Sequence, residues 1–235
     1  MNAGHSKSLQ IPLAFGDFQK NDFDSYLAGE NKILADQLKK IALNEIKHCV
    51  YLWGIEGSGK SHLLQATCKL ASEHDCHVAY IPLKLIDELS PEMLHDLGEL
   101  DLVCIDDLDF LGGKPEWQQA LVWLYNELRD RDHSLVMSAC VSPPTISLEI
   151  EDLKSRLSWD QVYQLKLPGD DLKIEILKQK AMARSFELSD EVIEYIMRRV
   201  NRDLHSLMQV FDQIDHASLA AKRKITIPFI KEFLS

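Results

Sequence analysis

The sequence GIEGSGKS at residues 54–61 decides the fold of this 235-residue chain, because it is a G-x-x-x-x-G-K-S phosphate loop in a suitable setting. An apolar segment typical of a buried strand (49–54) leads into it, and a pattern that predicts a helix (60–74) follows it. Glycines let backbone N–H groups turn toward phosphate oxygens, and the helix start adds the positive end of its dipole. A chance glycine-rich turn is the alternative, which the strand, the spacing and the Lys-Ser pair disfavour.

We therefore expect this loop to bind the phosphates of a nucleotide. Lys60 is expected to reach the β and γ phosphates, and the Ser61 hydroxyl is expected to hold Mg²⁺. The residues expected to contact the nucleotide here are Gly54, Gly57, Ser58, Gly59, Lys60, Ser61 and His62.

Two adjacent acids, Asp106 and Asp107, follow an apolar run in a segment typical of a strand (100–108). In a parallel sheet the end of that strand lies beside the phosphate loop. Asp106 is then expected to bind Mg²⁺ through water, and Asp107 to orient or activate the attacking water. The alternative is a pair of acids that ends a strand in solvent. Asp109 is expected to be solvated.

Segments that predict strands alternate with segments that predict helices up to residue 167, and three helical segments follow without a strand. This order favours an α/β fold with a five-stranded parallel sheet, followed by a small all-helical domain. The expected strands are 49–54, 77–83, 100–108, 134–140 and 161–167, and the expected helices are 31–43, 60–74, 115–131, 171–185, 189–200 and 203–222. The expected regions are a flexible tail (1–20), a nucleotide-binding core (21–167) and a helical lid (168–235), with ITIPFIKEFL as a short closing segment.

The composition is that of a globular protein, with 46% hydrophobic residues and a net charge of -11. That charge disfavours nucleic acid as a direct partner, since such proteins usually present a basic face. No apolar run approaches the roughly 18–20 residues of a membrane helix, and no secretory signal is present, so we expect a cytoplasmic protein. The five cysteines include no C-x-x-C pair, and we expect them to be reduced packing residues.

Five motifs occur in one order along the chain: FDSYLAGENKIL, GIEGSGKSHLL, VCIDDLDFL, LKSRLSW and ITIPFIKEFL. Together they resemble the AAA+ ATPase domain of the bacterial replication initiator DnaA, over about residues 18 to 235. The first and fourth motifs are the distinctive ones. The resemblance implies an AAA+ core with a three-helix lid that binds ADP or ATP, and it implies that Tyr26 and Leu27 border the base.

The sequence departs from the initiator in being acidic and in ending with the lid, where the initiator continues into a basic DNA-binding domain. A stand-alone core with a short tail resembles the Hda family, the regulatory inactivators of DnaA. That resemblance implies two partners, DnaA itself and the sliding clamp (the β subunit of the DNA polymerase), and a role in preventing re-initiation of replication. It implies no sequence-specific contact with DNA, and it leaves a homodimer open.

The tail fits the pattern Q-[LI]-x-L-x-[FL] of clamp-binding peptides. In such a peptide the apolar side chains fill a preformed groove, while the glutamine makes polar contacts at the groove's edge. Proline stiffens the peptide and so lowers the cost of ordering it. The residues concerned are Gln10, Ile11, Pro12, Leu13 and Phe15. The alternative is that Leu13 and Phe15 cover an apolar spot on the core.

Arg156 in LKSRLSW corresponds to the arginine finger that AAA+ proteins present to a neighbouring subunit's nucleotide. A guanidinium supplied in this way stabilises charge on the transferring phosphoryl group, and it raises the rate by about 10³–10⁵. The resemblance therefore predicts that Arg156 promotes ATP hydrolysis in DnaA, which is left in its ADP form. The alternative is an arginine that bridges core and lid within its own chain. Lys154 is expected to be a surface charge.

Two positions depart from the family pattern. His205 stands where the family usually has a nucleotide-sensing arginine, with Arg202 three residues earlier. A mostly neutral imidazole binds phosphate more weakly than a guanidinium does. The segment with Cys140 and Ser142 lacks the acidic or amide residue expected to position water. We therefore expect weak or no intrinsic ATPase activity.

Three other functions remain open from the sequence. An initiator-type or helicase-loading ATPase would show robust hydrolysis and DNA binding. A P-loop kinase or transferase would need a pocket for a small substrate, whereas the C-terminal segments here predict a lid. A structural adaptor would retain the nucleotide only for its stability.

Overall fold

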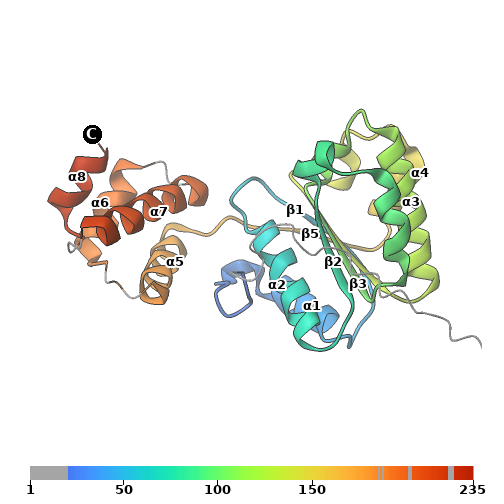
Figure 1. The fold of residues 1–235 in the computed structure, drawn as a ribbon, viewed down its shortest axis with the longest axis horizontal. Coiled ribbons are helices and arrows are strands. Elements are labelled where there is room, and N and C mark those ends of the chain that lie inside the picture. Colours follow the sequence, from blue (N-terminus) through green and yellow to red (C-terminus); the bar gives the residue numbers. More distant parts are fainter. Residues whose placement is uncertain (1–20, 185, 187, 201–202, 222–224, 235) are drawn as a thin grey trace, which may run out of the picture.

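The computed structural model describes residues 21–184, 186, 188–200, 203–221 and 225–234, and these form a sheet-containing core and a group of helices (Figure 1). The sheet has five parallel strands in the order β2-β3-β4-β1-β5. The strands are β1 (Cys49–Trp53), β2 (Val78–Pro82), β3 (Leu102–Asp106), β4 (Ser134–Ala139) and β5 (Gln161–Gln164). The predicted fold, a five-stranded parallel sheet followed by a helical lid, is confirmed.

Helices cover both faces of the sheet, because successive side chains along each strand point to opposite faces. In β1, Tyr51 belongs to one hydrophobic cluster, while Val50 and Leu52 belong to the other. The helices α1 (Lys32–Ala42) and α2 (Lys60–Glu73) lie over one face (Figure 1). The helices α3 (Pro115–Asp130) and α4 (Glu151–Leu157) lie over the other. This double layer holds the carboxyl ends of the strands, where the phosphate loop begins, in a fixed position.

The lid consists of α5 (Asp170–Ala183), α6 (Asp190–Arg199), α7 (Leu204–Ala221) and α8 (Ile227–Leu234). The expectation of three lid helices and a short closing segment is wrong, because that segment forms the fourth helix. Ile230 of α8 is fully buried in a cluster shared with Leu177, Ile193 and Phe211 from the other lid helices. Packing of this kind stabilises a helix too short to persist alone.

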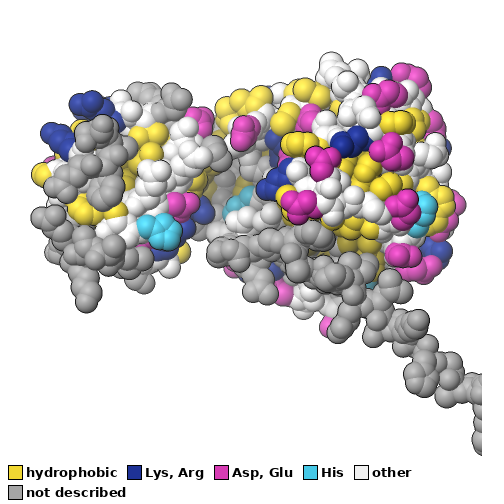
Figure 2. Space-filling view, turned by 45° about the horizontal axis from the view of Figure 1, so that its top comes forward, with side chains coloured by type: hydrophobic (Ala, Val, Ile, Leu, Met, Phe, Trp, Pro, Cys, Tyr) yellow, Lys and Arg dark blue, Asp and Glu magenta, His cyan; other side chains and the backbone are white. Residues whose placement is uncertain are grey.

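The described residues before α1 contact both parts of the molecule. Asp22 forms an ion pair with Lys69 of α2, with 2.9 Å between Oδ2 and Nζ. The Gln179 side chain of α5 donates a hydrogen bond of 2.9 Å to the Asp24 carbonyl. In Figure 2 an indentation separates lid and core on the face shown. Among the described residues, no helix has both the length and the hydropathy that a membrane span requires.

Candidate functional site

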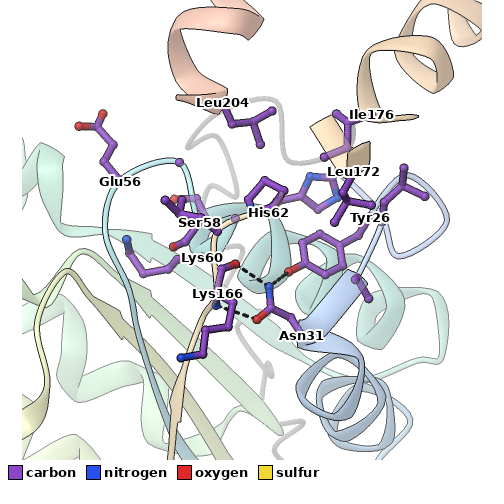
Figure 3. Close-up of a pocket in the computed structure, with 18 of the residues that line it drawn as sticks. Tyr26, Asn31, Glu56, Ser58, Lys60, His62, Lys166, Leu172, Ile176 and Leu204 are labelled. Atoms are coloured by element: carbon purple, nitrogen blue, oxygen red, sulfur yellow. Dashed lines mark hydrogen bonds between the residues drawn. The ribbon is translucent and has the colours of Figure 1, made fainter. Parts of the chain in front are cut away.

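A cavity of about 960 Å³ lies where the phosphate loop, the segment before α1 and the lid meet (Figure 3). This is within the size range of pockets that bind small molecules and cofactors. Its walls come mainly from the segment 25–31, the loop 56–62, the linker 166–169, and helices α5 and α7, and the core adds Lys84, Asp107, Phe110 and Cys140. Parts far apart in the sequence therefore close around one space.

The phosphate loop has a backbone that glycine alone adopts easily. Gly57 and Gly59 have φ angles of 77° and 97°. A Cβ atom on Gly59 would also lie 3.0 Å from the Tyr26 ring, which is tighter than ordinary packing. Helix α2 begins at the next residue, Lys60, so its unpaired N–H groups are available to an anion at this edge of the cavity.

The polar side chains of the loop fit a bound phosphate. The Lys60 ammonium donates hydrogen bonds to the carbonyls of Gly54 (2.6 Å) and Ile55 (3.3 Å), which are neutral acceptors. The Ser58 hydroxyl is buried and has no hydrogen-bond partner among the described residues. A buried polar atom without a partner is costly, so the loop offers a donor that a ligand can satisfy. Ser61 also lines the cavity.

The two acids after β3 differ in environment. Asp106 is 1% exposed, and it accepts hydrogen bonds from the hydroxyls of Tyr80 (2.7 Å) and Ser138. Asp107 lines the cavity, with a left-handed backbone at φ 63°. Burial, and next the charge of Asp106, raise the pKa of Asp107 to about 6. Asp107 thus faces the cavity, while Asp106 lies beneath it, and water-mediated metal binding by Asp106 stays a prediction.

Sequence reasoning missed both hydroxyl donors to Asp106. Tyr80 stands on β2 and Ser138 on β4, the two strands that flank β3. Ile105 pairs with Met137 in the sheet, so the next residues, Asp106 and Ser138, come side by side. The signal in the sequence was a polar residue in each of these two strands. This signal can be interpreted only once the strand order is known.

The segment after β4 presents a thiol near the loop lysine. Cys140 Sγ lies 3.9 Å from Lys60 Nζ, and burial raises the pKa of this thiol. Asp109 accepts a hydrogen bond of 2.7 Å from the Cys140 backbone N–H, and its side chain is partly exposed. The residue that lines the cavity here is Cys140, whose side chain has neither a carboxylate nor an amide.

The segment before α1 forms the wall opposite the loop, with Tyr26 and Leu27 among its residues. The Asn31 side chain pairs with the Lys166 backbone: Oδ1 accepts from its N–H (2.8 Å) and Nδ2 donates to its carbonyl (2.9 Å) (Figure 3). Nδ2 also contacts the Tyr26 hydroxyl at 3.4 Å. Sequence reasoning gave Asn31 no role, although it belongs to the distinctive first motif. It joins this wall to the linker that leads to the lid.

His62, on the first turn of α2, lies beside the same wall. Its Nε2 is 2.9 Å from the Asp22 carbonyl, and its ring centroid is 5.3 Å from that of Tyr26. Because a carbonyl only accepts, Nε2 carries the hydrogen and Nδ1 is left as an acceptor. Burial lowers the pKa of His62, which favours this neutral form.

The lid closes the cavity with apolar side chains. Leu172 and Ile176 come from α5, and Leu204 and Met208 come from α7. His205 also belongs to α7, but its side chain lies outside what the structure describes, as does Arg202. Helix α5 also contributes Asp170, Asp171 and Lys180 to this wall. The apolar part of the wall is suited to a ring rather than to a phosphate.

Arg156 lies apart from this cavity, on α4. It donates hydrogen bonds from Nε to Asp152 (2.9 Å) and from Nη1 to Asn126 (2.5 Å). Its guanidinium carbon is 5.5 Å from the centroid of the Tyr125 ring and 5.6 Å from that of the Trp159 ring. All four partners belong to the core, so these contacts do not bridge core and lid.

Two further predicted groups have simple outcomes. Lys154 forms an exposed ion pair with Glu151 at 3.1 Å, as expected of a surface charge. The proposed clamp-binding residues lie outside the described residues: Gln10, Ile11, Pro12, Leu13 and Phe15.

Comparison with known proteins divides the chain into two matched parts. Residues 18–164 match the family model of the bacterial DnaA ATPase domain, and residues 170–234 match that of the Hda lid domain. These ranges meet between β5 and α5.

Solved structures with the same fold include initiators and a motor protein. Domain III of DnaA from Thermotoga maritima is 24% identical with a TM-score of 0.77, and the match covers 91% of this chain and 97% of that one. AMPPCP-bound DnaA from Aquifex aeolicus is 23% identical with a TM-score of 0.69, covering 83% and 65%. The RuvB Holliday junction branch migration motor of Thermotoga maritima is 16% identical with a TM-score of 0.67, covering 92% and 72%. These likenesses concern the fold.

Proposed function

Because this chain belongs to the DnaA family of AAA+ ATPase domains and carries a lid of the Hda type, we propose that it regulates the initiator DnaA. It binds the sliding clamp through residues 10–15 and stimulates ATP hydrolysis by DnaA. The initiator is left in its ADP form, and a second round of initiation is prevented. Both proposed partners act on chromosomal DNA, and the proposed site of action is therefore the cytoplasm.

The position of Arg156 is the observation that carries this proposal. An arginine that acts on a partner's nucleotide has to lie away from its own, and Arg156 is outside the cavity of its own chain. Asp152 and Asn126 hold it, with 17% of its side chain exposed. Trp159 beside it is 58% exposed, so the surface around the guanidinium is partly apolar and suited to a protein partner.

The proposed reaction takes place in the partner's site. Water attacks the γ phosphorus of ATP bound to DnaA, and the bond from that phosphorus to the β–γ bridging oxygen breaks, which yields ADP and phosphate. Arg156 stabilises the negative charge of the transition state. Clamp binding raises the local concentration of this protein near DNA-bound DnaA, so weak docking is sufficient.

The chain's own cavity is proposed to bind ADP or ATP with Mg²⁺. Lys60, Ser58 and the N–H groups of the loop would contact the phosphates, and Ser61 and Asp106 would hold the metal. Asp107 would orient water, but Cys140 offers no carboxylate or amide to assist it. The nucleotide is therefore a conformational ligand rather than a substrate with rapid turnover. DNA is reached through the clamp, and a homodimer that covered Arg156 would be an inhibited form.

The test measures ADP formed by ATP-loaded DnaA in the presence of clamp loaded on DNA and this protein. Arg156→Ala should remove most of the stimulation, about 10³-fold if the finger has its usual effect. Gln10→Ala should abolish clamp binding. It should also lower the stimulation of DnaA when the concentration of this protein is limiting. Lys154→Ala, on the same helix, is the matched control and should behave as wild type.

Two results would contradict the proposal. Stimulation that survives Arg156→Ala would show that the finger assignment is wrong. Robust ATP hydrolysis by this protein alone, without DnaA, would instead favour an initiator-type or helicase-loading ATPase.

A further inference from the structure

Lys180 of α5 lines the cavity, yet its ammonium has no hydrogen bond or ion pair within the described part of the chain. The nearby acids of α7 form ion pairs with another residue. Arg184 binds Asp212 at 2.8 Å and Asp215 at 2.6 Å. Lys180 is therefore a half-buried cation whose donors are unused.

The helix geometry places Lys180 at the end of the cavity away from the loop lysine. Leu172, Ile176 and Lys180 are spaced by four residues, so they share one face of α5, and all three line the cavity. In Figure 3 Leu172 and Ile176 lie beside Tyr26, on the opposite side of the view from Lys60.

The electrostatics of His62 agree with this position. Burial lowers the pKa of His62, and the positive charge of Lys180 lowers it further. Both side chains line the same cavity. A nucleotide whose phosphates lie on the loop has its base at this end of the cavity.

Three polar side chains at this end, those of Asn31, His62 and Ser25, already have protein partners. Both polar atoms of the Asn31 amide bind the Lys166 backbone. His62 Nε2 and the Ser25 hydroxyl both lie within hydrogen-bond distance of the Asp22 carbonyl. The Lys180 ammonium remains as a flexible donor with three hydrogens.

Burial of such a group without an acceptor is unfavourable. The pKa of Lys180 is lowered by burial and then by the charge of Arg184, so the free protein pays part of this cost. A ligand atom that accepts a hydrogen bond here would relieve it.

We propose that Lys180 reads the base of the bound nucleotide, by donating a hydrogen bond from Nζ to a ring nitrogen or carbonyl oxygen. This inference rests on nucleotide binding in the cavity, and it is independent of DnaA and of the clamp. A base that presents an amino group at this position would be disfavoured, because the ammonium cannot accept a hydrogen bond.

The experiment compares the affinities of the full-length protein for ADP and for pyrophosphate by calorimetry. Lys180→Met keeps the length of the side chain and removes the ammonium. It should weaken ADP binding about 10-fold or more, the usual effect of losing a hydrogen bond to a charged group. Pyrophosphate binding should be unchanged. Lys178→Met is the matched control, since Lys178 is on the same helix and pairs with Asp190 at 2.5 Å.

A series of ADP analogues, in which each ring nitrogen in turn is replaced by C–H, identifies the acceptor. One analogue should bind the wild type more weakly than ADP does, but should bind Lys180→Met as tightly as ADP does. Lys180→Arg, which keeps donors, should retain more affinity than Lys180→Met. Equal thermal midpoints of the variants without nucleotide would exclude a folding defect.

Four results would overturn the inference. An equal loss of pyrophosphate and ADP affinity would make Lys180 a phosphate contact. Unchanged ADP affinity in Lys180→Met would show that no base contact exists. Analogues that all lower the affinity of Lys180→Met as much as that of the wild type would show the same. A wild-type protein that binds neither ADP nor pyrophosphate would overturn nucleotide binding itself, and this inference with it.

Discussion

The environment of Asp107 suits the candidate site but lowers the stability of the folded protein. Its carboxyl has an ordinary pKa of 3.8, which burial and the neighbouring Asp106 charge raise to about 6. Between these values the folded protein binds more protons than the unfolded chain, so stability falls as pH rises through this window. Above the window the ionised carboxylate, which lines the cavity, destabilises the folded state by a constant amount.

We predict that Asp107→Asn stabilises the nucleotide-free protein at pH 7 by roughly 1 kcal/mol, with solvent screening limiting the gain. The difference from wild type should shrink as pH falls from 6 toward 4, because the wild-type carboxyl is then neutral. Urea unfolding at a series of pH values measures this. A gain that stays constant with pH would show that the raised pKa is not its source.

Asp152 is predicted to position the arginine finger. Its carboxylate fixes Arg156 Nε at 2.9 Å, so Asp152→Ala should leave the guanidinium free to rotate away. Misplacement of a reacting group lowers rates by up to about 10²-fold, so we expect a 10-fold to 100-fold loss of DnaA stimulation in the assay described above.

The neighbouring acid provides the control for that prediction. Glu151 is on the same turn of α4 but binds Lys154, so Glu151→Ala should retain wild-type stimulation. Equal losses in the two variants would show that the charge of this helix matters, and not the contact with Arg156.

At the scale of elements, the link between the N-terminal wall and the β5–lid linker depends on one amide. Asn31→Asp keeps the shape but places an oxygen where Nδ2 donates to the Lys166 carbonyl. We expect a loss of about 1–3 kcal/mol, because one hydrogen bond becomes a repulsive contact. Hydrogen exchange should show faster opening at residues 166–169, with the sheet strands unaffected. Unchanged protection of that linker would contradict the prediction.

The elements that the sequence predicts well are those whose own pattern carries the information. Four of the five strands are mostly apolar runs, β5 alternates polar and apolar residues, and the phosphate loop is a local motif, so each is visible in one stretch of chain. Helix α8 was missed because only its burial against the other lid helices makes so short a segment helical. Asn31, Tyr80 and Ser138 were missed because their partners depend on strand order and on contacts across the fold.

At the scale of the molecule, two groups of functional atoms lie on different parts of one chain. The cavity lies where the core meets the lid, and Arg156 is held by core residues alone. A change in the lid would therefore leave the partners of Arg156 in place, which fits its proposed role as an arginine finger. This separation suits a protein that binds one nucleotide and acts on another.

The bond between Asn31 and Lys166 has a consequence for the synthesis of the protein on the ribosome. Its two residues are 135 positions apart in the chain. At a translation rate of about 5–20 residues per second, the linker is synthesised about 7–27 seconds after the wall it completes. The central strands can pair during that interval, while the cavity still lacks one side. The complete cavity is therefore not available to a nucleotide during that interval.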